Sequence, residues 1–281
     1  MANVAKVFLT FADSRISLDR IKMEAKRFKF DKLYAFCETD LDNDFWKKHK
    51  IFICTHSRGF GYWIWKAQVV LQVLKKMKDG DFLVYADAGC SLNVEGIVRM
   101  NEYYALIQEK KMDGLAFSLG LQESTWCKRD LLEYLNYTQP VEMESGQLIA
   151  TTFILRNSES VRELVKKWGY ICSHYHYITD APSVTPNRSN FDEHRHDQSI
   201  WSILRKQNGR HIILDNETWF HPDWHQHLDK PIHARHWLQK LNRPAARPMP
   251  ENKLDIEMRN ATYIDLISSY INRVWSFNII Q

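Results

Sequence analysis

Apolar and polar positions alternate in blocks along the first part of the chain, and these blocks predict strands and helices in turn. Residues 4–11 form a β-rich run that ends in a polar turn, and residues 32–37 predict a second strand. Between them, apolar residues recur at the spacing of one helical face: Leu18, Ile21, Ala25 and Phe28. This strand–helix–strand order is typical of a parallel sheet, so we expect an α/β fold.

The pattern continues through the middle of the chain. A helical period over residues 62–77 stops before Gly80, and a buried strand over 81–89 delivers Asp87 into a turn. Ligands of open α/β sheets collect at the carboxyl ends of the strands, which makes this turn a candidate site. Further strands are predicted at 114–119, 148–156 and 211–214, and further helices at 158–172 and 197–206.

Two segments stand apart from this alternation. Residues 178–193 are rich in Pro, Ser and Asn, and they predict a long loop that serves as a lid or a partner-binding segment. Residues 244–281 begin with a proline-rich linker and continue into an amphipathic helix. We therefore expect one domain over 1–243, with halves at about 1–115 and 116–243, followed by a C-terminal helical tail.

Composition narrows the class of protein. The 281 residues are 44% hydrophobic and 26% charged, which excludes a disordered chain, and the net charge of +4 is too small to indicate nucleic acid as the main partner. A smaller anion, such as a diphosphate, suits this charge. The five cysteines are scattered, the N-terminus resembles no export signal, and no apolar run approaches the about 18–20 residues of a membrane span. We therefore expect a cytoplasmic protein.

Asp87 is the first candidate for chemistry. It follows a strand end, and its small neighbours would let a ligand approach the backbone. A lone Asp at a strand end is often a turn or capping residue, and that alternative stays open. As a metal ligand, Asp87 would help to hold Mg²⁺ or Mn²⁺ together with the phosphate oxygens of a substrate.

The string 58–66 combines cations, glycines and aromatic rings. Arg58 and Lys66 suit phosphate, and the aromatic residues between them offer stacking surfaces. Trp63 also falls on the helical face that carries Leu71, so packing in the core is the alternative for this residue.

Asp197 and the histidines form the third group. Asp197 begins a predicted helix and suits an N-cap, but it is also placed to take a proton from a hydroxyl nucleophile. Ten of the 12 His lie between His174 and His236, and their pairs lack the spacing of a strong zinc motif. One histidine near the end of the domain could complete a metal shell, and the candidates are His221, His233 and His236.

Five motifs stand out along the chain, at residues 10–14, 58–66, 85–90, 123–128 and 196–199. Taken together, they resemble the GT-A class of nucleotide-sugar-dependent glycosyltransferases, and more narrowly a group found in polysaccharide assembly of bacteria and large viruses. The resemblance covers residues 4–240 and implies a single Rossmann-like α/β domain, with a mixed, mostly parallel central sheet flanked by helices. The N-terminal half would hold the nucleotide and the C-terminal half the acceptor.

The resemblance also implies roles for individual residues. Those implied to bind the nucleotide-sugar are Thr10, Phe11, Arg58, Lys66, Tyr85 and Asp87. Those implied to bind the acceptor are Glu123, Trp126, Lys128 and His196. The implied metal ligands are Asp87 and His233, with Tyr85 standing where an Asp-x-Asp motif would have its first carboxylate.

The resulting expectation is transfer of a sugar from a UDP-sugar to a hydroxyl of a glycan or lipid-linked glycan, assisted by Mn²⁺ or Mg²⁺. If the configuration inverts, which we favour, Asp197 is the base, and if it is retained, Asp197 positions the substrate. Two alternatives stay open: a metal-dependent hydrolase that uses the His-rich segment, and a non-catalytic carbohydrate-binding protein. The tail helix is a candidate for peripheral membrane contact.

Overall fold

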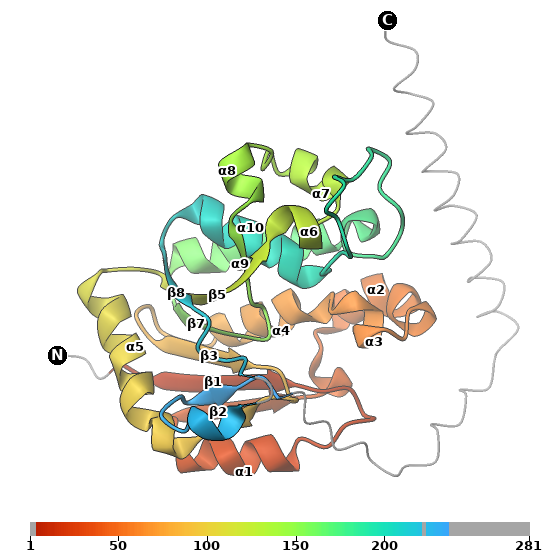
Figure 1. Cartoon of the computed structure of the whole chain (residues 1–281). Coiled ribbons are helices and arrows are strands. Elements are labelled where there is room, and N and C mark those ends of the chain that lie inside the picture. Colours follow the sequence, from red (N-terminus) through yellow and green to blue (C-terminus); the bar gives the residue numbers. More distant parts are fainter. Residues whose placement is uncertain (1–3, 221–222, 236–281) are drawn as a thin grey trace, which may run out of the picture. The chain divides into compact units, whose positions relative to one another are not determined.

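Figure 1 shows the computed structural model, which describes residues 4–220 and 223–235. By its contacts the chain divides into residues 1–240 and 241–281, and the described residues all belong to the first unit. The predicted linker and amphipathic helix lie outside the described residues, as do His221 and His236. None of the helices described between residues 4 and 235 has the length and apolar character that a membrane span requires.

The central sheet has seven strands: β1 (Lys6–Phe11), β2 (Lys32–Phe36), β3 (Phe82–Ala86), β5 (Gly114–Gln122), β6 (Gly146–Leu148), β7 (Thr152–Arg156) and β8 (His211–Asp215). Their order is β2–β1–β3–β7–β5–β6, with β8 paired to β5. β1 is parallel to β2 and β3, and β8 is parallel to β5, whereas β7 and β6 run antiparallel to their neighbours. The α/β class and the mixed sheet are therefore confirmed. A separate two-stranded sheet pairs β4 (Ser91–Leu92) with β9 (Ile232–His233).

Helices cover both faces of the central sheet (Figure 1). Side chains of β1 alternate between two cores, because Phe8 joins one cluster whereas Leu9 and Phe11 join the other. Both faces of the central strands are thus buried, as their continuous apolar runs predict. The first core lies under α1 (Asp19–Arg27) and α5 (Ile97–Glu109), and the second under α4 (Trp65–Leu74), α9 (Glu159–Cys172) and α10 (Asp197–Asn208).

Further elements complete the fold. Several helices were not expected from the sequence, including α2 (Asn43–Thr55) and α5, of 13 residues each. The helix α2 begins after Asp42, whose side chain accepts hydrogen bonds from the backbone of Asp44 and Phe45. The remaining helices are α3 (Gly59–Tyr62), α6 (Glu123–Trp126), α7 (Arg129–Tyr134) and α8 (Pro140–Met143), and the 3₁₀ turns are η1 (Glu38–Asp40), η2 (Val94–Gly96), η3 (Tyr175–Tyr177) and η4 (Trp224–Gln226). Between residues 178 and 196 the chain forms no helix or strand, which confirms the predicted long loop.

One predicted strand is wrong in a way that matters for the site. The chain over 146–156 instead forms two strands, β6 and β7, separated by a break at residues 149–151. At the break the Ala150 carbonyl accepts a hydrogen bond from Lys66 Nζ over 3.3 Å, whereas a continuous strand would direct this group to its own ladder. The Thr151 carbonyl still accepts the Asp87 N–H over 2.9 Å, in register with the β3–β7 pairing.

Candidate functional site

A pocket of ≈ 430 Å³ opens where β1 and β3 end. The two strands are parallel, so Phe11 at the end of β1 and Asp87 just after β3 reach the same edge of the sheet. α3, the start of α4, the 149–151 break and the start of α10 complete the wall. The pocket therefore lies where ligands of open α/β sheets bind, beyond the carboxyl ends of the strands.

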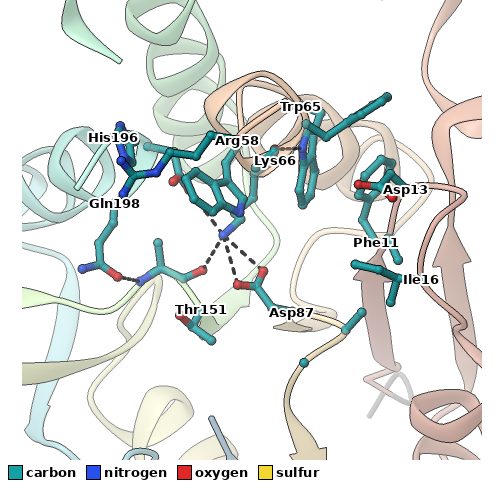
Figure 2. Close-up of a pocket in the computed structure, with 18 of the residues that line it drawn as sticks. Phe11, Asp13, Ile16, Arg58, Trp65, Lys66, Asp87, Thr151, His196 and Gln198 are labelled. Carbon is teal, nitrogen blue, oxygen red and sulfur yellow. Dashed lines mark hydrogen bonds and ion pairs between the residues drawn. The ribbon is translucent and has the colours of Figure 1, made fainter. Parts of the chain in front are cut away.

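Aromatic rings form one end of this pocket. The ring of Trp65 stacks on that of Phe11 with centroids 3.9 Å apart, and Phe60 lies 6.2 Å from Phe11. Figure 2 shows Asp13 at the same end, beside Phe11. The Arg15 guanidinium donates to both carboxylate oxygens of Asp13, over 3.0 and 2.6 Å. Stacking surfaces beside a polar edge suit a planar heterocycle such as a nucleobase.

The segment that leads into α4 is strained. Phe60, Tyr62 and Trp63 all have positive φ, at 54°, 52° and 59°, a region that is unfavourable for residues with a side chain. Gly59 also has positive φ, and a Cβ there would lie 2.4 Å from the Trp63 ring. Such strain concentrates at functional sites. Here it delivers Lys66, in the first turn of α4, into the pocket.

Lys66 lies at the centre of the pocket between two carboxylates. Its Nζ is 3.1 Å from Asp87 Oδ1 and 3.3 Å from Asp197 Oδ2, and Figure 2 shows the contact with Asp87. The Tyr85 hydroxyl donates to Asp87 Oδ1 over 2.5 Å. Asp197 begins α10, and Asp87 follows β3. The structure thus brings together residues that the sequence singled out in separate motifs.

Burial sets the proton affinities of this centre. Burial by itself lowers the pKa of Lys66, but the carboxylates of Asp197 and Asp87 outweigh it, and the pKa is raised. Burial raises the pKa of Asp197 to about 6, against the opposing effect of the Lys66 ammonium. Burial, and then the Asp87 charge, raise the pKa of Tyr85 well above its usual value, so Tyr85 stays a neutral donor.

The end of the pocket opposite the rings of Phe11 and Trp65 is basic. Arg58 and Arg195 both line it, together with His196. Figure 2 shows Arg58, His196 and Gln198 on the side of Lys66 away from Phe11. His196 has φ of 53° and ψ of −123°, and it directly precedes Asp197 at the start of α10. The strained backbone of His196 therefore helps to fix the direction from which Asp197 enters the pocket.

Some of the predicted donor and acceptor residues lie behind the pocket wall. Thr10 is buried in β1. Tyr85 is buried in β3, and its hydroxyl contacts the pocket-lining residue Asp87 by a hydrogen bond. Glu123 is fully buried, where it forms an ion pair with Lys206 over 2.7 Å and accepts a hydrogen bond from Ser202. None of these three predicted residues is among the described residues that line the pocket.

Trp126 and Lys128 contact the 178–196 loop, which borders the basic end of the pocket. The Lys128 ammonium donates to the backbone carbonyls of Thr179 and Ala181, over 3.0 and 3.1 Å, and burial lowers its pKa to about 8. The Trp126 ring lies 4.1 Å from the guanidinium carbon of Arg195, a cation–π contact. Both residues therefore hold wall segments in place, and neither is among the pocket-lining residues described.

Asp87 offers a place for a divalent cation. Its side chain is 27% exposed, and Mg²⁺ is commonly held by one or two protein carboxylates together with substrate phosphates. Among residues 4–220 and 223–235, no group of three or more His, Cys, Asp or Glu side chains is placed to hold a metal ion. Asp87 Oδ1 also contacts Lys66 Nζ at 3.1 Å, so an ion at Asp87 would need further ligands from a bound phosphate. Metal binding at Asp87 stays a prediction.

The predicted second metal ligand, His233, is buried in β9. It pairs with Ser91 of β4, and Ser91 stands four residues after Asp87 in the sequence. Its Nε2 lies 2.9 Å from the carbonyl oxygen of His227, and its Nδ1 lies 3.0 Å from Arg235 Nη2. Both ring nitrogens thus have partners within the chain. A metal-binding role for His233 stays a prediction.

Several residues of the pocket were not predicted from the sequence. Asp13 could have been found, because it stands in the polar turn directly after β1. Thr151 reaches the pocket because the chain breaks between β6 and β7, and Arg195 reaches it because of the path of the long loop. No pattern in the sequence around either residue indicates this position. Gln198 stands next to Asp197, and its side chain accepts a hydrogen bond from the Ala150 N–H over 3.0 Å.

Comparisons with known proteins give structural neighbours only, since no family model and no curated protein matches the chain. It is similar to a glycosyltransferase involved in the glycosylation of the major capsid of PBCV-1, with 10% identity and a TM-score of 0.44, over 82% of this chain and 92% of that one. It is also similar to the galactosyltransferase LgtC, in complex with donor and acceptor sugar analogs, with 10% identity and a TM-score of 0.41. This match covers 91% of this chain and 95% of LgtC. The bifunctional glycosyltransferase WbbM matches at 10% identity and 0.48, over 85% of this chain and 47% of its own length, so this chain spans about half of it. All three are glycosyltransferases, the class that the sequence motifs resemble.

Proposed function

We propose that this protein is a nucleotide-sugar-dependent glycosyltransferase, which moves a sugar from a nucleoside-diphosphate donor to a hydroxyl of a glycan. The observation that carries the proposal is the order of groups in one pocket. An aromatic end is followed by the Lys66 ammonium between Asp87 and Asp197, and then by a basic end. A nucleobase, a diphosphate, a transferred sugar and an acceptor require groups in this order.

The donor lies with its base against the ring of Phe11 and its diphosphate near Lys66 and Asp87. The polar edge formed by Asp13 and Arg15 offers both an acceptor and donors to the rim of the base. We propose a UDP-sugar as the donor to test first. Arg58 lies on the other side of Lys66, where the transferred sugar would meet the acceptor.

The leaving diphosphate gains negative charge in the transition state, and the Lys66 ammonium is a fixed positive charge in a buried site. A divalent ion bound at Asp87 would supply further positive charge there. Lys66 is held on both sides by carboxylates, so it needs little reorganisation when the charge develops. The Tyr85 hydroxyl restrains Asp87 in the same way, through the hydrogen bond to its Oδ1.

Asp197 is the proposed base for an inverting transfer. With its pKa raised by burial to about 6, its carboxylate is ionised at neutral pH and still basic enough to take a proton from the attacking hydroxyl. In a retaining transfer, the same carboxylate would position the donor sugar beside Lys66. The anomeric coupling constant of the transferred sugar in the glycoside product, measured by proton NMR and compared with that of the donor, distinguishes the two outcomes.

The two alternative functions find less support in the described residues. The hydrolase needs ring nitrogens that are free for a metal. However, both ring nitrogens of His194 have partners: Nδ1 accepts from the Lys128 N–H over 3.4 Å, and Nε2 lies 2.9 Å from the Tyr177 carbonyl oxygen. In the His194–His196 pair only His196 Nε2 is without a hydrogen-bond partner among the described residues, and one ring nitrogen does not make a metal site. A carbohydrate-binding protein without catalysis needs no buried ammonium between two carboxylates, and such a centre is costly to desolvate.

Calorimetry with UDP-, GDP- and dTDP-linked sugars, each with and without Mn²⁺, tests the proposal. We expect one nucleotide to bind, and the ion to tighten binding in the native chain. Asp87→Asn should lose the effect of the ion, whereas Asp79→Asn, at an exposed position outside the pocket, should keep it. If no nucleotide binds under any condition, the protein is not a transferase of this kind.

A further inference from the structure

The basic end of the pocket differs from the rest in how its charges are paired. Arg15 pairs with Asp13, and both line the pocket. Arg58 and Arg195 instead pair with carboxylates of the 178–196 loop that are not among the pocket-lining residues described. The two arginines therefore place positive charge in the pocket, and the negative charge that balances it stands outside.

These external ion pairs are exposed and readily exchanged. Arg58 Nη1 is 3.0 Å from Asp180 Oδ2, and Arg58 Nη2 is 4.0 Å from Glu193 Oε2. Arg195 Nη2 is 2.9 Å from Glu193 Oε1. The side chains of all four residues are 40–47% exposed, and exposed pairs of this kind contribute little stability. An oxyanion in the pocket could therefore replace Asp180 and Glu193 as the partner of these arginines.

His196 adds a polar atom with an unmet hydrogen bond. Its side chain is 3% exposed, and Nδ1 is held by the carbonyl oxygen of Ile178, so Nδ1 carries the hydrogen and Nε2 is the acceptor. Among the described residues, Nε2 has no hydrogen-bond partner, and its nearest charged neighbour is Asp180 Oδ1 at 3.6 Å. A buried acceptor on a pocket wall is suited to a ligand hydroxyl.

Arg195 is held in its orientation, which favours binding. The Trp126 ring stacks on its guanidinium at 4.1 Å, so the side chain loses little freedom when it meets a ligand. A guanidinium presents a planar pair of N–H groups that matches a carboxylate or a phosphate. Two arginines and a hydroxyl acceptor at one end of a pocket therefore suit a sugar that carries an oxyanion.

We propose that the acceptor is an acidic or phosphorylated sugar. Its carboxylate or phosphate binds Arg58 and Arg195 in place of Asp180 and Glu193, and a neighbouring hydroxyl donates to His196 Nε2. This inference rests on the proposed function, because it takes the aromatic end and Lys66 to be filled by the donor nucleotide.

Ligand-observed NMR on the full chain, with the donor end saturated by UDP or whichever nucleoside diphosphate binds, tests the proposal. The probes are methyl glucuronide, glucose 6-phosphate and neutral methyl glucoside. We expect at least one anionic probe to bind about tenfold more tightly than the neutral one, as two charge-assisted contacts would give. Whichever anion binds better distinguishes a uronic acid from a phosphosugar.

Two variants sharpen the test. Arg195→Gln should remove the preference for the anion, whereas Arg210→Gln, an exposed arginine that pairs with Asp113 outside the pocket, should retain it. The double change Asp180→Asn with Glu193→Gln should tighten anion binding, because it removes the internal competitors. Equal binding of charged and neutral probes in the native chain, or anion binding that survives Arg195→Gln, would overturn the proposal. A chain that binds no nucleotide at all contradicts the proposed function instead.

Discussion

Two ion pairs at the pocket each join a basic side chain to an aspartate, but one pair is buried and the other is exposed to solvent. At the centre, the side chains of Lys66 and Asp197 are 3% and 5% exposed. At the basic end, those of Arg58 and Asp180 are 47% and 45% exposed. The distances are alike, at 3.3 and 3.0 Å. Burial alone therefore separates a contact that is costly to break from one that is readily exchanged.

This difference indicates how the two parts work. The buried pair is costly to separate, which suits groups that must meet a developing charge without reorganising. The exposed pair can give up its internal partner to a ligand, which suits recognition. A fixed centre beside an exchangeable rim fits the transfer between two substrates that is proposed above.

The largest effect is expected from Lys66→Met, because this change leaves Asp197 buried without its cation. We expect transfer activity to be lost and the free energy of unfolding to fall by about 3–5 kcal/mol, as for other broken buried pairs. Urea unfolding followed by tryptophan fluorescence measures the change in stability. Lys75→Met, on the exposed side just after α4, is the matched control and should unfold like the native chain.

A double variant distinguishes loss of the ion pair from simple damage to the core. Adding Asp197→Asn to Lys66→Met removes the orphaned carboxylate, so part of the lost stability should return. If Lys66→Met unfolds at the native urea concentration, or if the second change destabilises the chain further, the buried pair does not have the assigned energetics.

The next largest effect is expected from Asp197→Asn. Transfer should fall by about 10²–10⁴-fold, the usual contribution of a general base, while donor binding persists. In the native chain, kcat/KM should rise with pH through about 6, as the carboxylate ionises, and the variant should lack this limb. Initial rates from pH 4.5 to 8 measure both, with Asp192→Asn, an exposed loop position, as the control.

Stability should move in the opposite direction over the same range. Because the folded pKa of Asp197 is raised from 3.8 to about 6, its contribution to stability is present below pH 3.8 and is lost as the pH rises through about 6. Asp197→Asn should therefore flatten the decline of stability between these values. A rate profile with the same limb in both proteins would show that another group is the base.

The fold could largely be predicted from the sequence because periodicity reports local structure. The strands β1, β2 and β3 and the helices α1, α9 and α10 all follow from patterns of apolar residues. The antiparallel insertion of β7 between β3 and β5 could not be predicted, because sheet order depends on contacts between distant segments. The 13-residue helices α2 and α5 were also not predicted, although they are long enough to show a helical period. The short helices α6–α8 were missed because four to six residues give too short a period to recognise.

The site was predictable where a residue stands at an element boundary. Asp87 follows a strand and Asp197 begins a helix, so position and residue type together indicated both. Glu123 shows the limit of this reasoning, because a motif in the sequence does not reveal that its carboxylate is buried against Lys206. Arg195 shows the converse, since only the folded loop brings it to the pocket.

The smallest effect on stability is expected from Arg58→Gln, which breaks an exposed pair. The free energy of unfolding should change by no more than about 0.5 kcal/mol, because solvent and salt already screen the contact. The same urea experiment at 50 and 500 mM NaCl measures it, and Arg129→Gln, which breaks a pair with Glu133 outside the pocket, is the control. A fall as large as that of Lys66→Met would mean that the loop around Asp180 is part of the rigid core. The contrast between a fixed centre and an exchangeable rim would then fail, and with it the reason to expect a ligand anion in place of Asp180.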